Sequence, residues 1–181
     1  MIYIYLANGY EETEMIAPLD LIRRAGLDVK TVSVTADNMV TGSHGITVKA
    51  DTTVFDADYD VTKADMVILP GGLPGTTNLE ASEQVRNALT YGFENGKYVC
   101  AICAAPSVLG KMGILKGKRA VCYPGFEKYL DGAINTDSRC ERDGKVITAV
   151  GMGAAVEFGL AIVTALCGKE MSEKLKNGIL A

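Results

Sequence analysis

The residues that could do covalent chemistry lie in Lys97–Pro106, where an apolar run reaches Cys103 and turns at once into small residues and a helix start. This order is typical of a nucleophile elbow, in which a tight strand-to-helix turn holds a reactive side chain exposed above a sheet. Ala101, Ala104 and Ala105 supply the small neighbours that the bend requires. We expect the first N–H groups of the helix to favour the thiolate, because their partial positive charge attracts an anion. A buried, inert cysteine is the alternative.

Three glutamates could supply the acid that such a thiol needs. Glu11, Glu12 and Glu14 all follow the first apolar run of the chain. We select Glu14, because the apolar residues of the predicted helix place this position near its buried edge. Beside a thiol in an apolar pocket, its carboxyl should have a raised pKa and stay protonated, so that it can donate a hydrogen bond to the thiolate. The alternative is that all three acids simply complement the helix dipole.

A glycine pair, Gly71 and Gly72, follows a later apolar run. Its backbone N–H groups could face an oxyanion, with the N–H of Ala104 as a second donor. A tight turn is the commoner reason for two glycines after a strand, and this alternative stays open. The chain therefore offers a candidate nucleophile, acid and anion site, provided that the fold brings them together.

The elements that must position these residues alternate between short apolar runs and amphipathic stretches, the pattern of alternating strands and helices. Strands are predicted at 2–7, 29–34, 65–69, in the run up to Cys103 and at 120–123, with a loop at 36–45 and a short extended piece at 46–50. Helices are predicted at 12–25, from Ser82 to the stop at Gly96, from the elbow to about Met112, at 154–166 and at 171–176. Asp143-Gly144 predicts a hairpin turn between strands 138–142 and 146–150.

Continuous apolar strands between helices predict an α/β fold, a flavodoxin-like three-layer sandwich with a largely parallel sheet and helices on both faces. No repeat or linker divides the chain, so residues 1–181 are predicted to form a single domain. In such sheets ligands bind beyond the carboxyl ends of the strands. Because the glutamates, the glycine pair and Cys103 each follow a predicted strand, we expect them to converge on one crevice.

Composition narrows the class of protein. The net charge of −4 argues against a nucleic-acid partner, and the apolar runs are too short or interrupted to cross a membrane. Five cysteines, an odd number, and the absence of a basic leader favour reduced thiols and a cytoplasmic location.

Two further motif interpretations are weaker, and neither a metal nor a cofactor is predicted. The spacing of Cys100 and Cys103 fits a thiol oxidoreductase, but Cys100 lies inside the apolar strand rather than at a helix start. A zinc site that adds Cys122 and Cys140 would lack a second close pair. Gly151-Met-Gly153 resembles a dinucleotide fingerprint, but the third glycine is missing.

Four motifs together resemble the ThiJ/PfpI superfamily, in the glyoxalase III-like branch that contains the parkinsonism-associated protein deglycase: Glu11–Glu14, Leu69–Gly72, Ala101–Pro106 and Glu157–Ile162. The resemblance covers essentially the whole chain. It implies a homodimer in which Cys103 is the nucleophile and oxidation-sensitive thiol, and Glu14 its protonated hydrogen-bond partner. It also implies that the amides of Gly72 and Ala104 form the anion site. The implied activities are cofactor-free conversion of methylglyoxal or glyoxal, repair of early glycation adducts, and oxidative-stress protection.

The chain departs from this pattern at two positions. Some members of the branch carry a histidine beside the cysteine where this chain has Tyr123, and a phenol is a poor base at neutral pH. The only histidine, His44, occupies a loop position where relatives carry an arginine near the dimer interface, and it could reach Asp20 of a second copy. An exposed loop histidine is the plainer alternative. Gly71 and Tyr123 are predicted to border the pocket.

The same details separate the chain from other branches. Ala104 stands where peptidase-like members carry a histidine, and no histidine follows residue 44 to complete an amidotransferase triad. Two hypotheses remain. In one, the protein is an enzyme whose Cys103 adds to small dicarbonyls and forms a hemithioacetal. In the other, the protein is a non-enzymatic oxidative-stress sensor or chaperone whose Cys103 is oxidised.

Overall fold

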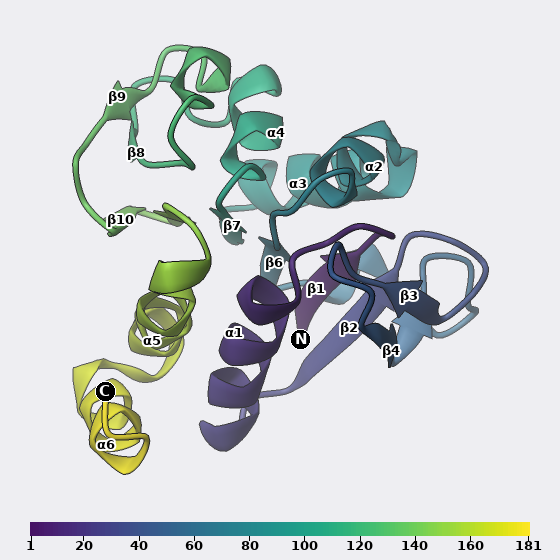
Figure 1. Ribbon diagram of the computed structural model, residues 1–181, viewed down its shortest axis with the longest axis horizontal. Coiled ribbons are helices and arrows are strands. Elements are labelled where there is room, and N and C mark those ends of the chain that lie inside the picture. Colours follow the sequence, from purple (N-terminus) through teal and green to yellow (C-terminus); the bar gives the residue numbers. More distant parts are fainter.

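The computed structural model describes residues 1–181 as three layers, a seven-stranded sheet between two layers of helices (Figure 1). In spatial order the strands are β10 (Cys140–Asp143), β11 (Val146–Ala149), β7 (Tyr98–Ile102), β6 (Met66–Leu69), β1 (Ile2–Leu6), β2 (Val29–Ser33) and β5 (Thr52–Thr53). Neighbouring strands are parallel except in the β10–β11 hairpin. The predicted flavodoxin-like α/β sandwich is therefore confirmed.

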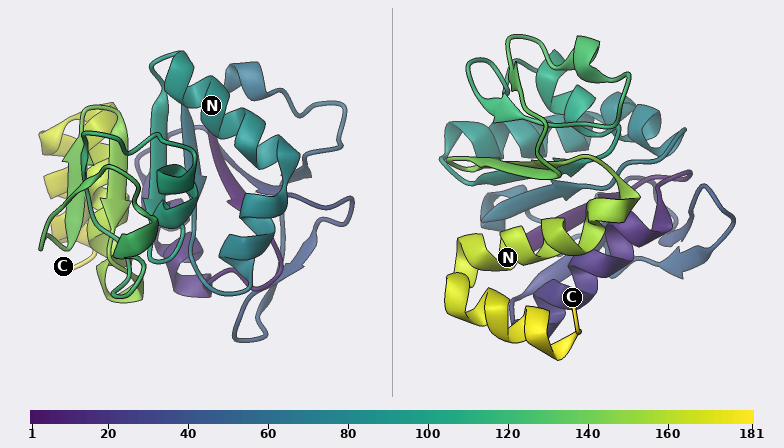
Figure 2. Two further views of the ribbon diagram at one scale, coloured as in Figure 1. Left: turned by 90° about the horizontal axis from the view of Figure 1, so that it is seen from above. Right: turned by 60° about the vertical axis from the view of Figure 1, so that its left-hand side comes forward.

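The central strands β1, β6 and β7 form because their side chains are apolar on both faces. In β1, Ile2, Ile4 and Leu6 belong to one buried cluster, while Tyr3 and Tyr5 belong to the other. This alternation lets one strand supply two cores. Below the sheet in Figure 1 lie α1 (Glu12–Arg24), α5 (Ala155–Cys167) and α6 (Lys169–Gly178), and above it lie α2 (Gly75–Ala81), α3 (Glu83–Glu94) and α4 (Pro106–Lys111). The right-hand view of Figure 2 shows the sheet between these layers. None of the helices is long and apolar enough to span a bilayer.

Two small sheets lie outside the central one. The first pairs β3 (Met39–Thr41) with β4 (Thr47–Lys49), and the second pairs β8 (Arg119–Ala120) with β9 (Ile134–Asn135). Single 3-10 turns occur at Val61–Lys63, Glu127–Tyr129 and Met152–Ala154. The last of these leads directly from β11 into α5, close to the end of β7.

Most predicted elements agree with the structure to within about two residues, but two predictions were wrong, and helix α2 and the two-residue strands β5 and β9 were missed. The predicted loop 36–45 contains β3, a strand of three residues that is too short for its alternating pattern to be recognised in the sequence. The predicted strand 120–123 is reduced to β8 and lies outside the central sheet. Helix α2 was not predicted, because glycine and threonines at its start disfavour a helix. It forms through tertiary contact, since Gly75 donates a backbone hydrogen bond to Gly9 (3.0 Å) and Leu79 is buried.

Helix α1 and helix α5 approach closely, and this contact fixes the helix that carries Glu14. A Cβ placed on Gly159 of α5 would lie 2.6 Å from Cδ1 of Leu21 and 3.0 Å from Cα of Pro18, both on α1. The absence of a side chain at Gly159 therefore allows the two helices to pack.

We predict that Gly159→Gln lowers the free energy of unfolding by about 2–3 kcal/mol, because the new side chain must push α5 away from α1. Gly178→Gln is the matched control, since Gly178 ends α6 with open space around it. Urea denaturation of both variants measures the difference. Equal stability of the two variants would contradict the close packing of α1 on α5.

Candidate active site

Cys103 occupies a strained backbone position immediately after β7. Its φ is 64°, in the left-handed region that residues other than glycine rarely adopt. Two backbone hydrogen bonds hold it there: its N–H donates to the carbonyl of Ala149 (2.9 Å), and its carbonyl accepts from the N–H of Tyr123 (2.8 Å). With α4 beginning at Pro106, the tight strand-to-helix turn predicted from the sequence is present.

The peptide of Gly71 joins Cys103 to the start of α1. Its N–H donates to Oε2 of Glu14 (2.9 Å), and its carbonyl accepts from the N–H of Glu11 (2.9 Å). A Cβ on Gly71 would lie 2.6 Å from the Cβ of Cys103 and 2.6 Å from Oε2 of Glu14. Position 71, two residues after β6, must therefore be glycine for the nucleophile and the acid to meet, and the ends of β1, β6 and β7 do converge as predicted.

Glu14 is almost completely buried, with 1% of its surface exposed. Its Oε1 atom has no hydrogen-bonded nitrogen or oxygen partner. Burial raises the pKa of Glu14 to about 7, although hydrogen bonds to the Cys103 side chain and the Gly71 N–H act in the opposite direction. The raised pKa agrees with the sequence-based prediction and places the carboxyl near its titration midpoint at neutral pH.

The expected preference of Cys103 for the thiolate was wrong. Burial, and secondly the charge of Glu14, raise the pKa of the Cys103 thiol to about 12, although the N–H groups of Gly72 and Ala104 face the sulfur and favour the anion. Loss of water and a neighbouring carboxylate outweigh two backbone dipoles. Because Glu14 and Cys103 are in contact, their titrations are coupled.

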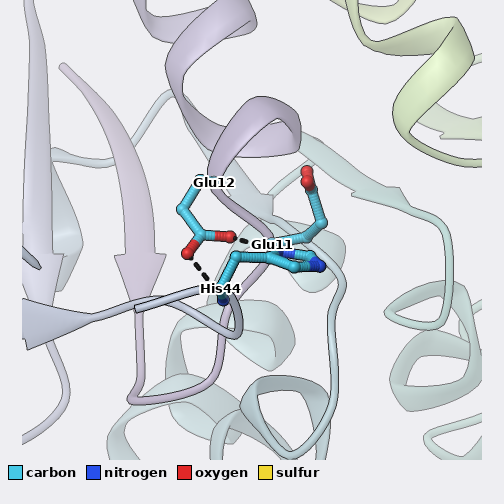
Figure 3. A group of neighbouring side chains, drawn as sticks. All are labelled: Glu11, Glu12 and His44. Carbon is cyan, nitrogen blue, oxygen red and sulfur yellow. Dashed lines mark hydrogen bonds and ion pairs between the residues drawn. The ribbon is translucent and has the colours of Figure 1, made fainter. Parts of the chain in front are cut away.

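The three glutamates that follow β1 have three different roles in the structure. Glu11 caps α1, because its Oε2 accepts a hydrogen bond from the N–H of Glu14 (2.6 Å). Glu12 accepts bonds from the His44 N–H (2.8 Å) and from His44 Nδ1 (2.9 Å), and Figure 3 shows the Glu11 carboxylate turned away from this pair. Burial opposes ionisation of Glu12, but the bonds from His44 and Ile46 outweigh it and lower its pKa to about 2. Only Glu14 therefore reaches Cys103.

The residues predicted at a dimer interface make contacts within the chain. The His44 side chain is 71% exposed and pairs with Glu12, while Asp20 pairs with Arg24 at 2.6 Å. Glu11, Glu12 and His44 have ligand atoms within 4.8 Å of one another, the spacing of a metal site, but both acids are already occupied by backbone N–H groups. The interface role of Asp20 and His44 stays a prediction.

A cavity of about 180 Å³ opens above the sulfur of Cys103. It is lined by Gly72, Leu73, Cys103, Ala104, Tyr123 and Phe126. Gly71 lies behind Cys103 and does not line this cavity, in contrast to the prediction. Leu73 and Phe126 were missed, because single apolar residues in glycine-containing loops show no periodicity. The largest cavity, about 490 Å³ between α5 and α6, contains none of these residues.

The other cysteines are free thiols. Cys100 is fully buried in the layer of α1 and α5, where burial raises its pKa. It is therefore not an accessible partner for a thiol oxidoreductase motif with Cys103.

Comparisons with known proteins agree on one family. A model described as the DJ-1/PfpI family matches residues 1–165. Protein DJ-1 homolog A of Arabidopsis thaliana is 35% identical over 182 residues, which cover 99% of this chain and 46% of the relative. The chain thus spans less than half of that relative's length. Protein dj-1beta of Drosophila melanogaster is 36% identical, with 98% of this chain and 95% of the relative covered.

Solved structures give the same result. The crystal structure of Drosophila melanogaster DJ-1beta superposes with a TM-score of 0.92 and 35% identity, covering 99% of this chain and 97% of that one. Toxoplasma gondii DJ-1, in a structure described as oxidized, superposes with a TM-score of 0.91 and 31% identity over the same shares of the two chains.

We predict that Glu14→Gln becomes more stabilising as pH rises from about 5 to about 8. The pKa of Glu14 is raised from 4.5 to about 7 in the folded protein, so within this window the unfolded chain releases a proton that the folded protein keeps. Rising pH therefore favours unfolding of the parent but not of the variant. Across the window, the variant's free energy of unfolding relative to the parent should rise by about 2.5 kcal/mol. Denaturation at several pH values measures this difference, and a pH-independent difference would contradict the burial argument.

Proposed function

The chain belongs to the DJ-1/PfpI family, and we propose that it is a cysteine-dependent, cofactor-free glyoxalase and deglycase-type enzyme. Its substrates would be methylglyoxal, glyoxal or early glycation adducts. One observation carries the proposal: the buried carboxyl of Glu14 lies against the thiol of Cys103 at the base of a small, open cavity. Burial raises the pKa of this carboxyl to about 7. An acid with this pKa can both accept and return a proton at neutral pH.

The first step of the proposed reaction forms a hemithioacetal. The sulfur of Cys103 attacks the aldehyde carbon while Glu14 accepts the thiol proton, so that no free thiolate has to persist. The carbonyl oxygen becomes an oxyanion beside the sulfur. The N–H groups of Gly72 and Ala104 already face this sulfur and lie suitably to stabilise the new negative charge.

The later steps move hydrogen within the substrate. Glu14 returns its proton to the oxyanion, and a proton then passes from the former aldehyde carbon to the neighbouring carbonyl carbon through an enediol. This step oxidises the first carbon and reduces the second, which leaves a thioester on Cys103. Water hydrolyses the thioester to the 2-hydroxy acid and restores the thiol. The net change is addition of one water, so methylglyoxal gives lactate without an external oxidant or reductant.

A second candidate role is sensing of oxidants. Cys103 is partly exposed and is surrounded by donors, namely the N–H groups of Gly72 and Ala104 and the carboxyl of Glu14 when protonated. These groups would stabilise a sulfinate. It forms when two molecules of hydrogen peroxide each transfer one oxygen to the sulfur and are reduced to water. The Toxoplasma gondii relative has a structure described as oxidized, which supports this alternative.

We also propose a homodimer formed through the outer face of α1. Ile16 and Ile46 are large, exposed apolar residues that line one shallow depression together with Asp20. Apolar side chains grouped in this way favour contact with another protein surface. A second copy packed there would bring its own Asp20 toward His44.

We predict that the purified protein forms lactate from methylglyoxal without glutathione, and that Cys103→Ser and Glu14→Gln each lower kcat/KM at least about 100-fold. Cys167→Ser is the matched control, because Cys167 is an exposed thiol at the end of α5. It should retain full activity. Absence of lactate from protein whose Cys103 is demonstrably reduced would contradict the enzyme proposal and favour the oxidation sensor.

For the dimer, we predict that Ile16→Arg yields monomers in sedimentation equilibrium, because it places a charge within an apolar contact. The control Phe93→Arg changes an exposed aromatic on α3, in the opposite helix layer, and should leave the dimer intact. A dimer that persists in the Ile16→Arg variant would exclude the α1 face.

A further inference from the structure

The cavity above Cys103 has an unusual chemical character for a site that binds a small polar aldehyde. Of its six lining residues, none carries a charged side chain. Its mouth is apolar and open to water, with Leu73 55% exposed and Tyr123 51% exposed. Exposed apolar side chains gathered at the entrance of a reactive site favour a ligand that covers them.

A tight turn holds two of these side chains in place. The N–H of Phe126 donates to the carbonyl of Tyr123 (3.0 Å), and Gly125 between them has a φ of 92°. This geometry is that of a type II turn, which needs a residue with positive φ, here Gly125, at its second central position and commonly has proline, here Pro124, at its first. The N–H of Gly125 is bonded to the Glu127 carboxylate (2.7 Å), which reinforces the turn.

The same turn is attached to the nucleophile. The N–H of Tyr123 donates to the carbonyl of Cys103 (2.8 Å), so the first residue of the turn is tied to the elbow itself. At the other end, the ring of Phe126 packs against Tyr129 with ring centroids 5.8 Å apart. The two aromatic residues on the cavity are therefore fixed relative to the sulfur before any substrate arrives, which lowers the entropy cost of binding.

The charge distribution around the cavity disfavours substrates with an anionic substituent. A substrate carboxylate would lose water in this cavity without gaining a cation, because the N–H groups of Gly72 and Ala104 are directed at the sulfur. The acid behind Cys103 is Glu14, which repels an anion when ionised. An apolar substituent, in contrast, gains free energy by covering the side chains of Leu73 and Phe126. A ring would gain further from the aromatic edges.

We infer that the turn Tyr123–Phe126 and Leu73 select 2-oxoaldehydes whose substituent is uncharged and apolar, with aryl glyoxals preferred over methylglyoxal. This substrate class rests on the proposed glyoxalase function. The reaction balances as before: phenylglyoxal and one water give mandelate, through the hemithioacetal and thioester of Cys103.

The first experiment compares kcat/KM for phenylglyoxal and methylglyoxal. Phe126→Ala should lower the value for phenylglyoxal roughly tenfold, the expected effect of removing an apolar contact wall, and that for methylglyoxal less than about twofold. The control Phe93→Ala removes an exposed phenylalanine that does not line the cavity, and it should change neither value. Equal losses for both aldehydes in Phe126→Ala would overturn the inference.

The second experiment tests the cavity without turnover. Cys103 is alkylated with iodoacetanilide, iodoacetamide or iodoacetate, and the modified peptide is quantified by mass spectrometry because four other thiols are present. Each rate is divided by that of N-acetylcysteine. We expect iodoacetanilide to be favoured roughly tenfold over iodoacetamide and iodoacetate to be disfavoured, with the first preference lost in Phe126→Ala.

The two experiments separate the inference from the proposed function. Turnover of methylglyoxal with equal normalised alkylation rates for all three reagents would overturn the inference and leave the glyoxalase proposal standing. Turnover of neither aldehyde, with the iodoacetanilide preference retained, would overturn the glyoxalase proposal and support the apolar selectivity of the cavity.

Discussion

The close approach of Gly71 to both Cys103 and Glu14 is the constraint on which the rest of the site depends. Its N–H and carbonyl bind the start of α1, and its missing side chain allows the acid to contact the thiol. The consequence is electrostatic. Burial outweighs the hydrogen bonds that Glu14 accepts, so the pKa of its carboxyl rises to about 7. A carboxyl with this pKa can both accept and return a proton at neutral pH.

The surrounding structure stabilises the strained backbone conformation of Cys103. A left-handed backbone at a residue such as Cys103 costs about 1–3 kcal/mol, which the surrounding structure must offset. Bonds to Ala149 and Tyr123 fix Cys103 from two sides, and the packing of α1 against Gly159 of α5 holds α1 in place beside the sheet. The hydrogen bond from Tyr123 also holds this aromatic residue beside the sulfur. One contact therefore stabilises the strained backbone of Cys103 and positions a residue of the substrate cavity.

Much of this could be predicted from the sequence, because continuous apolar strands and a cysteine before small residues follow local rules. The predictions that failed concern features that depend on tertiary structure. Helix α2 forms only because Gly75 approaches Gly9, and the wall at Phe126 comes from a loop without periodicity. The predicted direction of the Cys103 pKa shift was also wrong, because a helix start can be recognised in a sequence but the depth of burial cannot. The apolar positions of the helix singled out Glu14 among the three glutamates, but the contacts that occupy Glu11 and Glu12 could not be predicted from the sequence.

The account makes one claim above the others, that Cys103 and Glu14 share a proton. The most direct test is the rate of Cys103 alkylation by iodoacetamide as a function of pH, in the parent protein and in Glu14→Gln. The parent should show a step near pH 7, the value at which the pair first loses a proton, and the variant should lack it. A step near pH 7 that persists in the variant, or its absence from the parent, would contradict the shared proton.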